Sequence, residues 1–288
     1  MDDDAFRHLP QLRGCIRAPA NSPLRVTPEV LAQWDAGALA AGQPADWRLP
    51  DAQREGLRQA FLRALPVQQD LWVFAYGSLM WDPGFHFAEL RLAALAGWRR
   101  RFAYRITGGR GTPEQPALML SLEPGDGTCR GLAFRIEAAA VESESACIWR
   151  REMVRGGYRP TWLPLATPQG PVQAVVFAAN TDHPEHIAEL PPAETAAIIA
   201  RAAGPLGSNR DYLEQLARQL GRLGLADDYV AALHRRVSAL PGGTGAAALP
   251  SSSGTSARTY NLNLTGVNGR TLPATTTTDP TSFLDELE

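Results

Sequence analysis

The stretch Leu71-Trp-Val-Phe-Ala-Tyr-Gly-Ser78 is the most informative local signal in this sequence of 288 residues. It begins as a run of aromatic, β-branched and other apolar side chains, which is typical of a buried strand. Gly77 and Ser78 end that strand in a loop, where consecutive backbone N–H groups can surround a carboxylate or an oxyanion. The alternative is an ordinary turn between a strand and a loop, and spacing alone favours that alternative.

Strands and helices alternate downstream of this stretch. Strands are predicted at about 99–106, 117–123, 130–136, 159–166 and 172–179, separated by turns such as Glu123-Pro-Gly-Asp-Gly127. A helix predicted at about 138–154 interrupts them, and helices at about 193–203, 209–222 and 226–239 follow. This order indicates one domain of mixed α and β structure over 70–240.

The two ends of the chain differ from this domain in composition and in predicted structure. Residues 1–69 are predicted to form a helical arm, with one helix from Thr27 to about Trp34 and a second from Asp51 to Leu65. The second helix carries Leu57, Phe61 and Leu65 on one stripe. Residues 241–288 are rich in Gly, Ala, Ser and Thr, so they cannot bury enough apolar surface to offset their ordering entropy. We expect this tail to be disordered.

Composition excludes several classes of function. All 28 basic residues are arginine, which rules out a lysine Schiff base, a lysine-anchored pyridoxal phosphate and a P-loop. The net charge of −2 resides in the tail, and a neutral body gives no reason to expect nucleic acid as a partner. The one dense basic run, Arg99-Arg100-Arg101, is interpreted as a solvated strand edge.

Cysteine and histidine usage argues against disulfides and metal sites. The three cysteines are far apart in the sequence, which favours a reducing compartment. His183 and His186 form an H-x-x-H pair in a loop-like stretch with no third ligand nearby, so a surface loop is preferred over zinc. The acidic N-terminus is unlike a signal peptide, and no apolar run approaches the length of a membrane span. We therefore expect a cytoplasmic protein without membrane insertion.

Glu152 is the carboxylate in the most unusual place. On the helix predicted at about 138–154, it lies above Ile148 and Trp149, on the apolar side. Burial and the partial negative charge of the helix C-terminus both raise a carboxylate pKa, which suits a general base near neutral pH. The alternative is a structural ion pair with Arg155 or Arg159, and the residue alone favours that alternative.

A third segment, Gly204-Pro-Leu-Gly-Ser-Asn-Arg-Asp-Tyr212, reads as a tight loop followed by a helix. Asn209 is predicted to cap that helix, and Tyr212 would lie in its first turn, where it can point back at the loop. A plain connection between two helices accounts for the same residues equally well.

Together these segments resemble the ChaC family of glutathione-specific γ-glutamylcyclotransferases. The resemblance covers about 70–240, and the preceding arm is similar to the bacterial branch. It is carried by Val73-Phe-Ala-Tyr-Gly-Ser-Leu-Met-Trp81, Gly109-Arg-Gly-Thr112, Arg151-Glu-Met153, Gly156-Gly-Tyr158 and Gly204-Pro-Leu-Gly-Ser-Asn209 with Tyr212-Leu213. It implies an α+β fold with a small mixed sheet, twisted or barrel-like, and surrounding helices. Two features depart from the family: Ala75 stands where Gly is usual, and the low-complexity tail is foreign to it.

The resemblance also implies an activity. In the family, a glutamate that matches Glu152 is the catalytic acid/base, and the strand-loop binds the γ-glutamyl group of glutathione. The implied substrate-binding residues are Val73, Phe74, Ala75, Tyr76, Gly77, Ser78 and Tyr212. The α-amine of the substrate is its own nucleophile and closes a five-membered ring, which yields 5-oxoproline and Cys-Gly. This chemistry requires no metal and no cofactor.

The glycine carboxylate of glutathione needs a cation, and arginine is the long one that this sequence offers. Arg110, in a Gly-rich loop, and Arg105, at a strand end, are the two possibilities, although both can equally be solvated. The ChaC name is also attached to the regulation of cation transport, so a non-catalytic partner of a membrane antiporter is the alternative function. A carboxylate on an apolar helix face beside an anion-binding loop favours the enzyme.

Overall fold

The structure, a computed structural model, describes residues 3–40 and 44–241. Its centre is a curled sheet of five strands in the order β2-β3-β1-β5-β4. The strands are β1 (Leu71–Ala75), β2 (Glu89–Ile106), β3 (Ala117–Ile136), β4 (Tyr158–Leu165) and β5 (Val172–Ala179). The β1–β5 pair is parallel and the other pairs are antiparallel, so the predicted mixed sheet in an α+β fold is confirmed.

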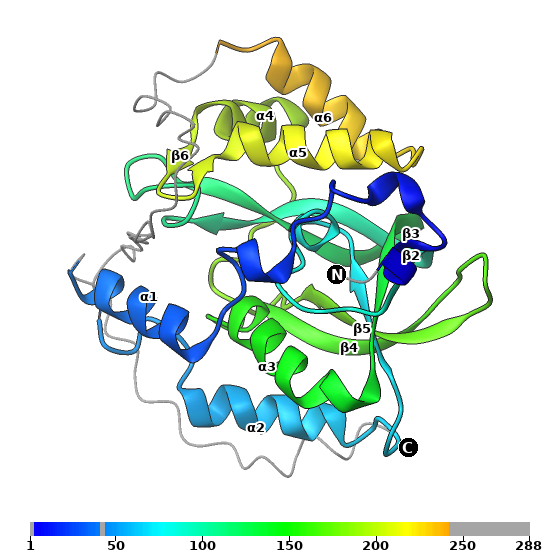
Figure 1. Ribbon diagram of the computed structural model, residues 1–288. Helices are drawn as coiled ribbons and strands as arrows, with labels where there is room; N and C mark the ends of the chain where they lie inside the picture. The colour runs from blue at the N-terminus through cyan, green and yellow to red at the C-terminus, as the bar shows by residue number, and fades with distance from the viewer. Residues whose placement is uncertain (1–2, 41–43, 242–288) are drawn as a thin grey trace.

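Helices cover the sheet on both sides (Figure 1). On one side lie α4 (Pro192–Arg201), α5 (Asn209–Arg222) and α6 (Asp228–Ser238), close to the three helices that the sequence predicts. On the other side lie α2 (Asp51–Leu62) and α3 (Val141–Glu152), beside α1 (Pro28–Ala40). A two-stranded hairpin, β6 (Ala203–Gly204) and β7 (Gly207–Ser208), precedes α5. Short 3-10 turns occupy Asp3–Phe6, Pro10–Leu12, Pro19–Asn21, Ser78–Met80 and Ala138–Ala140.

Strands β2 and β3 form one long antiparallel ladder, from Glu89 opposite Arg135 to Ile106 opposite Ala117. The predicted turn at Glu123–Gly127 is therefore wrong, because the two strands expected on either side of it are one continuous strand. The ladder absorbs the Pro and Gly residues at an irregularity, where the register shifts between Ala96 and Trp98. A bulge of this kind accommodates extra residues while the flanking pairs stay in register.

The core lies around β1, which is central in the sheet. Val73, Phe74 and Ala75 have no exposed surface, because β3 and β5 flank the strand and helices cover its faces. Helix α3 packs Trp149 against Phe177 of β5, with ring centroids 5.0 Å apart. This contact fixes the helix relative to the sheet and so determines where its last residue, Glu152, lies.

Helix α2 packs through part of the expected apolar stripe and also through a buried arginine. Phe61 stacks on Trp162 with ring centroids 4.7 Å apart, and Leu65, just beyond the helix, packs against the core. Leu57 is 43% exposed, whereas Arg58 is almost fully buried.

The Arg58 guanidinium donates to Ser145 at 2.9 Å and also binds Glu142, both on α3. These partners satisfy the buried charge of Arg58, and Phe61 also contacts α3 through Trp149. The periodicity of apolar residues predicts the inner position of Phe61 but not that of Arg58.

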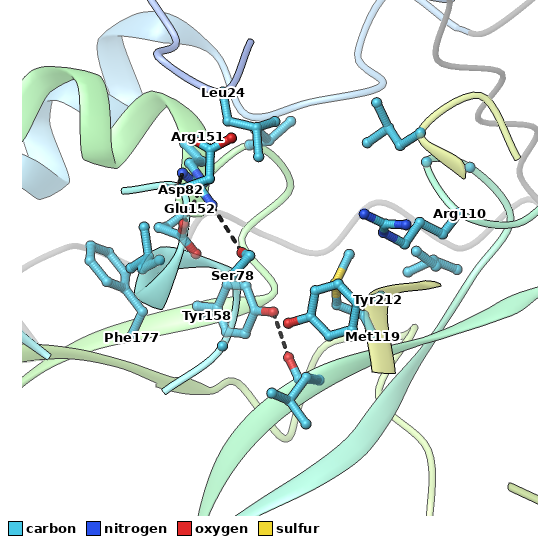
Figure 2. Close-up of a pocket in the computed structure, with 18 of the residues that line it drawn as sticks. Leu24, Ser78, Asp82, Arg110, Met119, Arg151, Glu152, Tyr158, Phe177 and Tyr212 are labelled. Carbon is cyan, nitrogen blue, oxygen red and sulfur yellow. Dashed lines mark hydrogen bonds and ion pairs between the residues drawn. The ribbon is translucent and has the colours of Figure 1, made fainter. Parts of the chain in front are cut away.

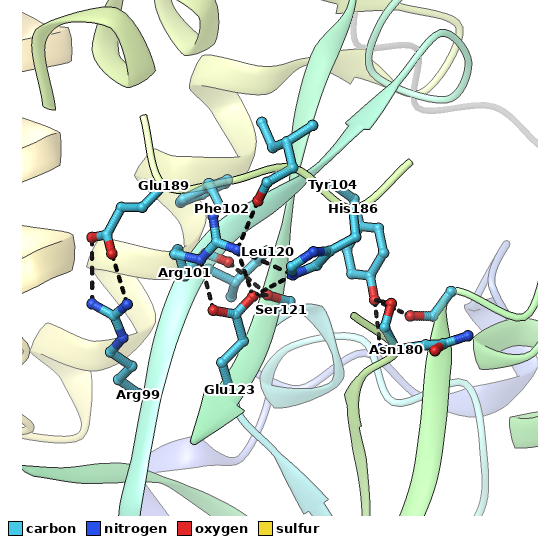
Figure 3. A network of polar contacts seen from close by, with 12 residues as sticks. Arg99, Arg101, Phe102, Tyr104, Leu120, Ser121, Glu123, Asn180, His186 and Glu189 are labelled. Atoms are coloured by element: carbon cyan, nitrogen blue, oxygen red, sulfur yellow. Dashed lines mark hydrogen bonds and ion pairs between the residues drawn. The ribbon is translucent and has the colours of Figure 1, made fainter. Parts of the chain in front are cut away.

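The arginine triplet is also not a solvated edge (Figure 3). Arg99 is exposed and pairs with Glu189, but Arg100 and Arg101 are buried. Arg101 forms a bidentate pair with Glu123 at 2.6 and 2.8 Å, and His186 Nε2 lies 2.8 Å from the same carboxylate. Figure 3 shows His186 reaching this pair from its loop, so the H-x-x-H stretch packs against the sheet.

No helix in the described ranges is long and apolar enough to cross a membrane. The sequence-predicted disordered tail, residues 241–288, lies outside the described residues except for Pro241.

Candidate active site

A pocket of about 500 Å³ opens where the loop after β1, the end of α3 and the start of α5 meet. That volume is within the usual range for a small-molecule site. Six of the sequence-predicted residues line it: Tyr76, Gly77, Ser78, Arg110, Glu152 and Tyr212. In Figure 2, Ser78 and Glu152 lie on one side of the pocket and Arg110 on another, with Tyr212 between them. Val73, Phe74 and Ala75 do not line it, because they form the buried strand β1 that carries the loop.

The loop after β1 is shaped for close approach. A Cβ on Gly77 would lie 2.8 Å from the hydroxyl oxygen of Tyr212, so any other residue here would force that hydroxyl to move. The backbone N–H of Ser78 faces the same hydroxyl and is one of the groups that moderate the Tyr212 pKa. The Tyr212 hydroxyl therefore points back at the loop, as the sequence predicted for a tyrosine in the first turn of this helix.

Tyr76 contributes to the site through its backbone and not its hydroxyl. Its hydroxyl donates to the carbonyl of Phe177 at 2.7 Å, and its own carbonyl accepts from Arg100 Nε at 2.7 Å. Both partners are buried, so the start of the loop is held rigidly. The buried Arg100, interpreted from the sequence as an edge residue, thus positions the loop.

Glu152 is the last residue of α3, and its side chain is 14% exposed. Burial raises its pKa, and the neighbouring Arg151 guanidinium, with Nε 3.0 Å from the carboxylate, opposes that rise. The expected alternative partners are engaged elsewhere, since Arg155 pairs with Glu185 and Arg159 with Asp182. Glu152 therefore has the desolvated setting of a general base.

Arg151 is a site residue that sequence reasoning missed. Its Nη2 donates to Ser78 Oγ at 2.9 Å, and its Nη1 donates to the carbonyls of Asp82 and Pro83 at 2.6 and 3.0 Å. One guanidinium therefore ties the loop to the helix end that carries Glu152. The adjacency of Arg151 and Glu152 in the sequence was a usable signal, but which of several arginines clamps the loop depends on the tertiary structure.

Buried phenols surround the carboxylate. Burial raises the pKa of Tyr212 to about 12, and it raises that of Tyr158 well above the usual value. Both hydroxyls therefore stay protonated near neutral pH. Tyr158, another residue not expected from the sequence, donates to the carbonyl of Leu120 at 2.8 Å, whereas the Tyr212 hydroxyl is aimed at the loop.

Arg110 lies at the other end of the pocket. Its Nη1 donates to the carbonyl of Ser208 at 2.8 Å, and its guanidinium lies 5.3 Å from the centre of the Tyr212 ring. Among the pocket arginines, Arg17, Arg151 and Arg155 each have a carboxylate partner within the described chain, whereas Arg110 has none there. Burial lowers the pKa of Arg110, and the nearby Tyr212 and Asp211 oppose that shift without forming an ion pair with it. Arg105, the second possibility, is exposed and does not line the pocket.

The start of α5 differs in one detail from expectation. Ser208, and not Asn209, is the N-cap: its hydroxyl accepts from the N–H of Asp211 at 2.9 Å, and Asp211 completes a capping box. Asn209 is buried and exchanges hydrogen bonds with the backbone of Leu118 at 2.8 and 3.0 Å. This lock on β3 fixes the first turn of α5, and with it Tyr212.

The pocket thus combines a desolvated carboxylate, a loop with N–H and hydroxyl donors, and a half-buried cation at its other end. A family model described as ChaC-like protein matches residues 71–240, which include every residue of this constellation. The chain belongs to the ChaC-like family. Among the described residues of this chain, no group of three or more His, Cys, Asp or Glu side chains is arranged to hold a metal ion.

Curated relatives of this ChaC-like protein carry consistent names. The glutathione-specific γ-glutamylcyclotransferase of Escherichia coli K12 is 42% identical over 169 residues, which cover 58% of this chain and 73% of that protein. Glutathione-specific γ-glutamylcyclotransferase 1 of Danio rerio is 35% identical over 52% of this chain and 79% of its own length. The corresponding human protein is 32% identical over 52% of this chain and 69% of its own length.

A solved structure supports the fold. The selenomethionine-labelled yeast γ-glutamyl cyclotransferase specific to glutathione superposes with a TM-score of 0.54 at 23% identity, over 59% of this chain and 96% of that one. The fold that the ChaC resemblance implied is therefore confirmed.

Proposed function

We propose that this chain is a glutathione-specific γ-glutamylcyclotransferase, a carbon–nitrogen lyase that converts glutathione to 5-oxoproline and Cys-Gly. One observation carries the proposal: the buried carboxylate of Glu152 and the Gly77–Ser78 loop face the same pocket, and Arg151 ties them together. The names of its relatives, from bacteria to vertebrates, support the same activity and substrate.

The proposed reaction needs only groups that the pocket contains. Glu152 accepts a proton from the α-ammonium of the substrate, and the free amine attacks the γ-carbonyl carbon to close a five-membered ring. The loop N–H groups and the Tyr212 hydroxyl donate to the oxyanion that forms. Glu152 then returns the proton to the cysteinyl nitrogen as the γ-carbon–nitrogen bond breaks. The ring nitrogen gives its second proton to the departing amine, so 5-oxoproline keeps one N–H and Cys-Gly leaves as an ammonium. Because the attack is intramolecular, correct orientation supplies much of the rate.

Arg110 is proposed to bind the glycine carboxylate of glutathione. Burial of a guanidinium that makes no ion pair within the described chain is costly, and an anionic ligand relieves that cost. Its contact with Ser208 occupies part of its donor fork, so other N–H groups remain for a carboxylate. Its place across the pocket from Glu152 in Figure 2 suits a substrate with its reacting bond at one end and a carboxylate at the other.

Residues 70–240 are proposed to be the catalytic domain, with residues 1–69 as an arm against it. The protein is proposed to act in the cytoplasm, where glutathione keeps thiols reduced. The free state of Cys15, Cys129 and Cys147 supports this. No observation favours the alternative role as a partner of a cation antiporter.

A direct assay tests the function. Purified protein with millimolar glutathione should release equal amounts of 5-oxoproline and Cys-Gly, and a chelator should not slow the release, because the proposed acid, base and oxyanion donors are all protein groups. Glutathione that stays intact for hours at high protein concentration would refute the proposal.

A further inference from the structure

One wall of the pocket comes from the N-terminal arm, before residue 71, where the match to the family model begins. The arm residues that line the pocket are Arg17, Pro23, Leu24, Trp34 and Trp47. Apart from Arg17 they are apolar, whereas the catalytic carboxylate and the loop donors lie on the domain side. In Figure 2, Leu24 and Arg110 lie on opposite sides of the pocket, with Tyr212 below them.

The arm packs on residues 81–84, the segment that follows the loop after β1. The backbone N–H of Arg17 donates to the carbonyl of Trp81 at 2.9 Å, and Ser22 Oγ donates to Asp82 at 2.5 Å. Gly84 has a φ of +72°, and a Cβ there would lie 2.7 Å from the carbonyl oxygen of Leu24. The backbone around Leu24 therefore rests directly on the domain.

Two further contacts hold the arm against α3. Arg25 forms a bidentate pair with Glu144 at 2.6 and 2.9 Å, and the N–H of Leu49 donates to the carbonyl of Val154 at 2.9 Å. Trp34 and Trp47 belong to a small second core, against which Val154 and Leu206 of the domain pack. The wall is therefore preformed, and binding a ligand against it costs little ordering entropy.

We propose that this wall, formed by Pro23, Leu24, Trp34 and Trp47, binds the leaving half of the γ-glutamyl substrate and selects for its first side chain. The proposal rests on the proposed function. With the γ-glutamyl group at Ser78, Glu152 and Tyr212, the rest of the substrate extends toward the arm and Arg110. A glycine carboxylate at Arg110 leaves the cysteinyl side chain, which is small and weakly polar, to face Leu24.

Such a wall acts on binding and not on chemistry. Leu24 has no group that can exchange a proton with the substrate or stabilise an oxyanion, so its contact is equal in the ground state and the transition state. Loss of a contact of this kind raises KM and leaves kcat unchanged. Removal of a few methyl groups from an apolar subsite changes discrimination by about tenfold.

The test compares two substrates in Leu24→Ala. Glutathione carries the cysteinyl side chain, whereas γ-glutamyl methylamide has no such side chain to contact the wall. We expect KM for glutathione to rise about five- to tenfold, with kcat within about twofold. The kcat/KM for γ-glutamyl methylamide should not change. Leu24→Met, which keeps the apolar volume, should restore KM for glutathione.

Leu39→Ala is the matched control, because Leu39 lies on the same arm, is 71% exposed and does not line the pocket. Leu24→Asp is a second variant, and we expect it to raise KM for glutathione more strongly than Leu24→Ala does. Its melting temperature should not change, because Leu24 is only half-buried. An equal fall in kcat/KM for both substrates, or an unchanged KM for glutathione in both Leu24→Ala and Leu24→Asp, would overturn the proposed role of the arm and leave the proposed function standing. Wild-type protein inactive on both substrates would overturn the proposed function, and this proposal with it.

Discussion

Replacement of Glu152 by glutamine is the most informative perturbation of the site. The change keeps the shape of the side chain and removes its ability to accept a proton. A positioned acid/base contributes about 10²–10⁴-fold in rate, and Glu152 serves two proton transfers in the proposed reaction. We therefore expect kcat for glutathione to fall at least about 10³-fold, toward the upper end of that range, with KM little changed.

The fold should tolerate this substitution for reasons visible in the structure. Arg151 loses one partner but keeps Ser78 and the carbonyls of Asp82 and Pro83, so the loop stays in place. Burial raises the pKa of Glu152, so the folded protein binds a proton more tightly than the unfolded chain. The contribution of Glu152 to the free energy of unfolding therefore falls as the pH rises from its unfolded pKa through the raised folded pKa. A neutral glutamine removes that cost, and the melting temperature at neutral pH should not fall.

The assay measures 5-oxoproline release by chromatography, together with thermal unfolding of both proteins. Glu194→Gln is the matched control, because Glu194 is an exposed carboxylate in the first turn of α4, outside the pocket. Wild-type kcat should also fall as the pH is lowered through the raised pKa, since the base must be ionised. Turnover of Glu152→Gln within about tenfold of wild type, far short of the effect of a positioned base, would refute the assignment and move the chemistry to another group.

Three other substitutions probe the remaining groups of the pocket. Arg151→Met should lower kcat at least about tenfold and move the acid limb of the pH profile to higher pH, because the charge that lowers the Glu152 pKa is lost; an unmoved acid limb would contradict this, and Arg151→Lys should restore part of it. Gly77→Ala should raise KM for every γ-glutamyl substrate, since its Cβ would meet the Tyr212 hydroxyl at 2.8 Å; unchanged kinetics would show that the loop accommodates a methyl group. Arg110→Ala should raise KM for glutathione about tenfold or more, the scale of a charge-assisted contact, but not KM for γ-glutamyl methylamide; equal losses would mean that Arg110 only shapes its loop.

Local sequence identified the elements where one physical signal dominates. The apolar run before Gly77 indicated a buried strand, and β1 is fully buried at the centre of the sheet. Helical spacing placed Glu152 on the apolar side of its helix, and that carboxylate is indeed largely buried. These predictions hold because strand and helix periodicity map directly onto the two sides of an element. The family motifs supplied the rest of the site, since their order along the chain is a long-range pattern.

Charged residues are where local reasoning was wrong. The arginine triplet was interpreted as a solvated edge, yet Arg100 and Arg101 are buried. Arg54 and Arg58 of α2, to which no sequence pattern assigned a position, are buried as well. An arginine is buried when carboxylates or carbonyls from distant segments satisfy its donors, as Asp227 and Tyr76 do for Arg100. These partners are far from the arginine in the sequence, so composition and spacing cannot identify them and predict an exposed side chain instead.

The sequence by itself therefore determined the positions of most helices, the buried strand β1 and the buried glutamate, because each follows from the apolar pattern within one segment. Only the tertiary structure decided that Arg151 clamps the loop, that Ser208 caps α5 while Asn209 locks to β3, and that the arm closes one wall of the pocket. These features join residues far apart in the chain. Their geometry depends on how the helices dock on the sheet, and that docking is set by the packing of the whole core.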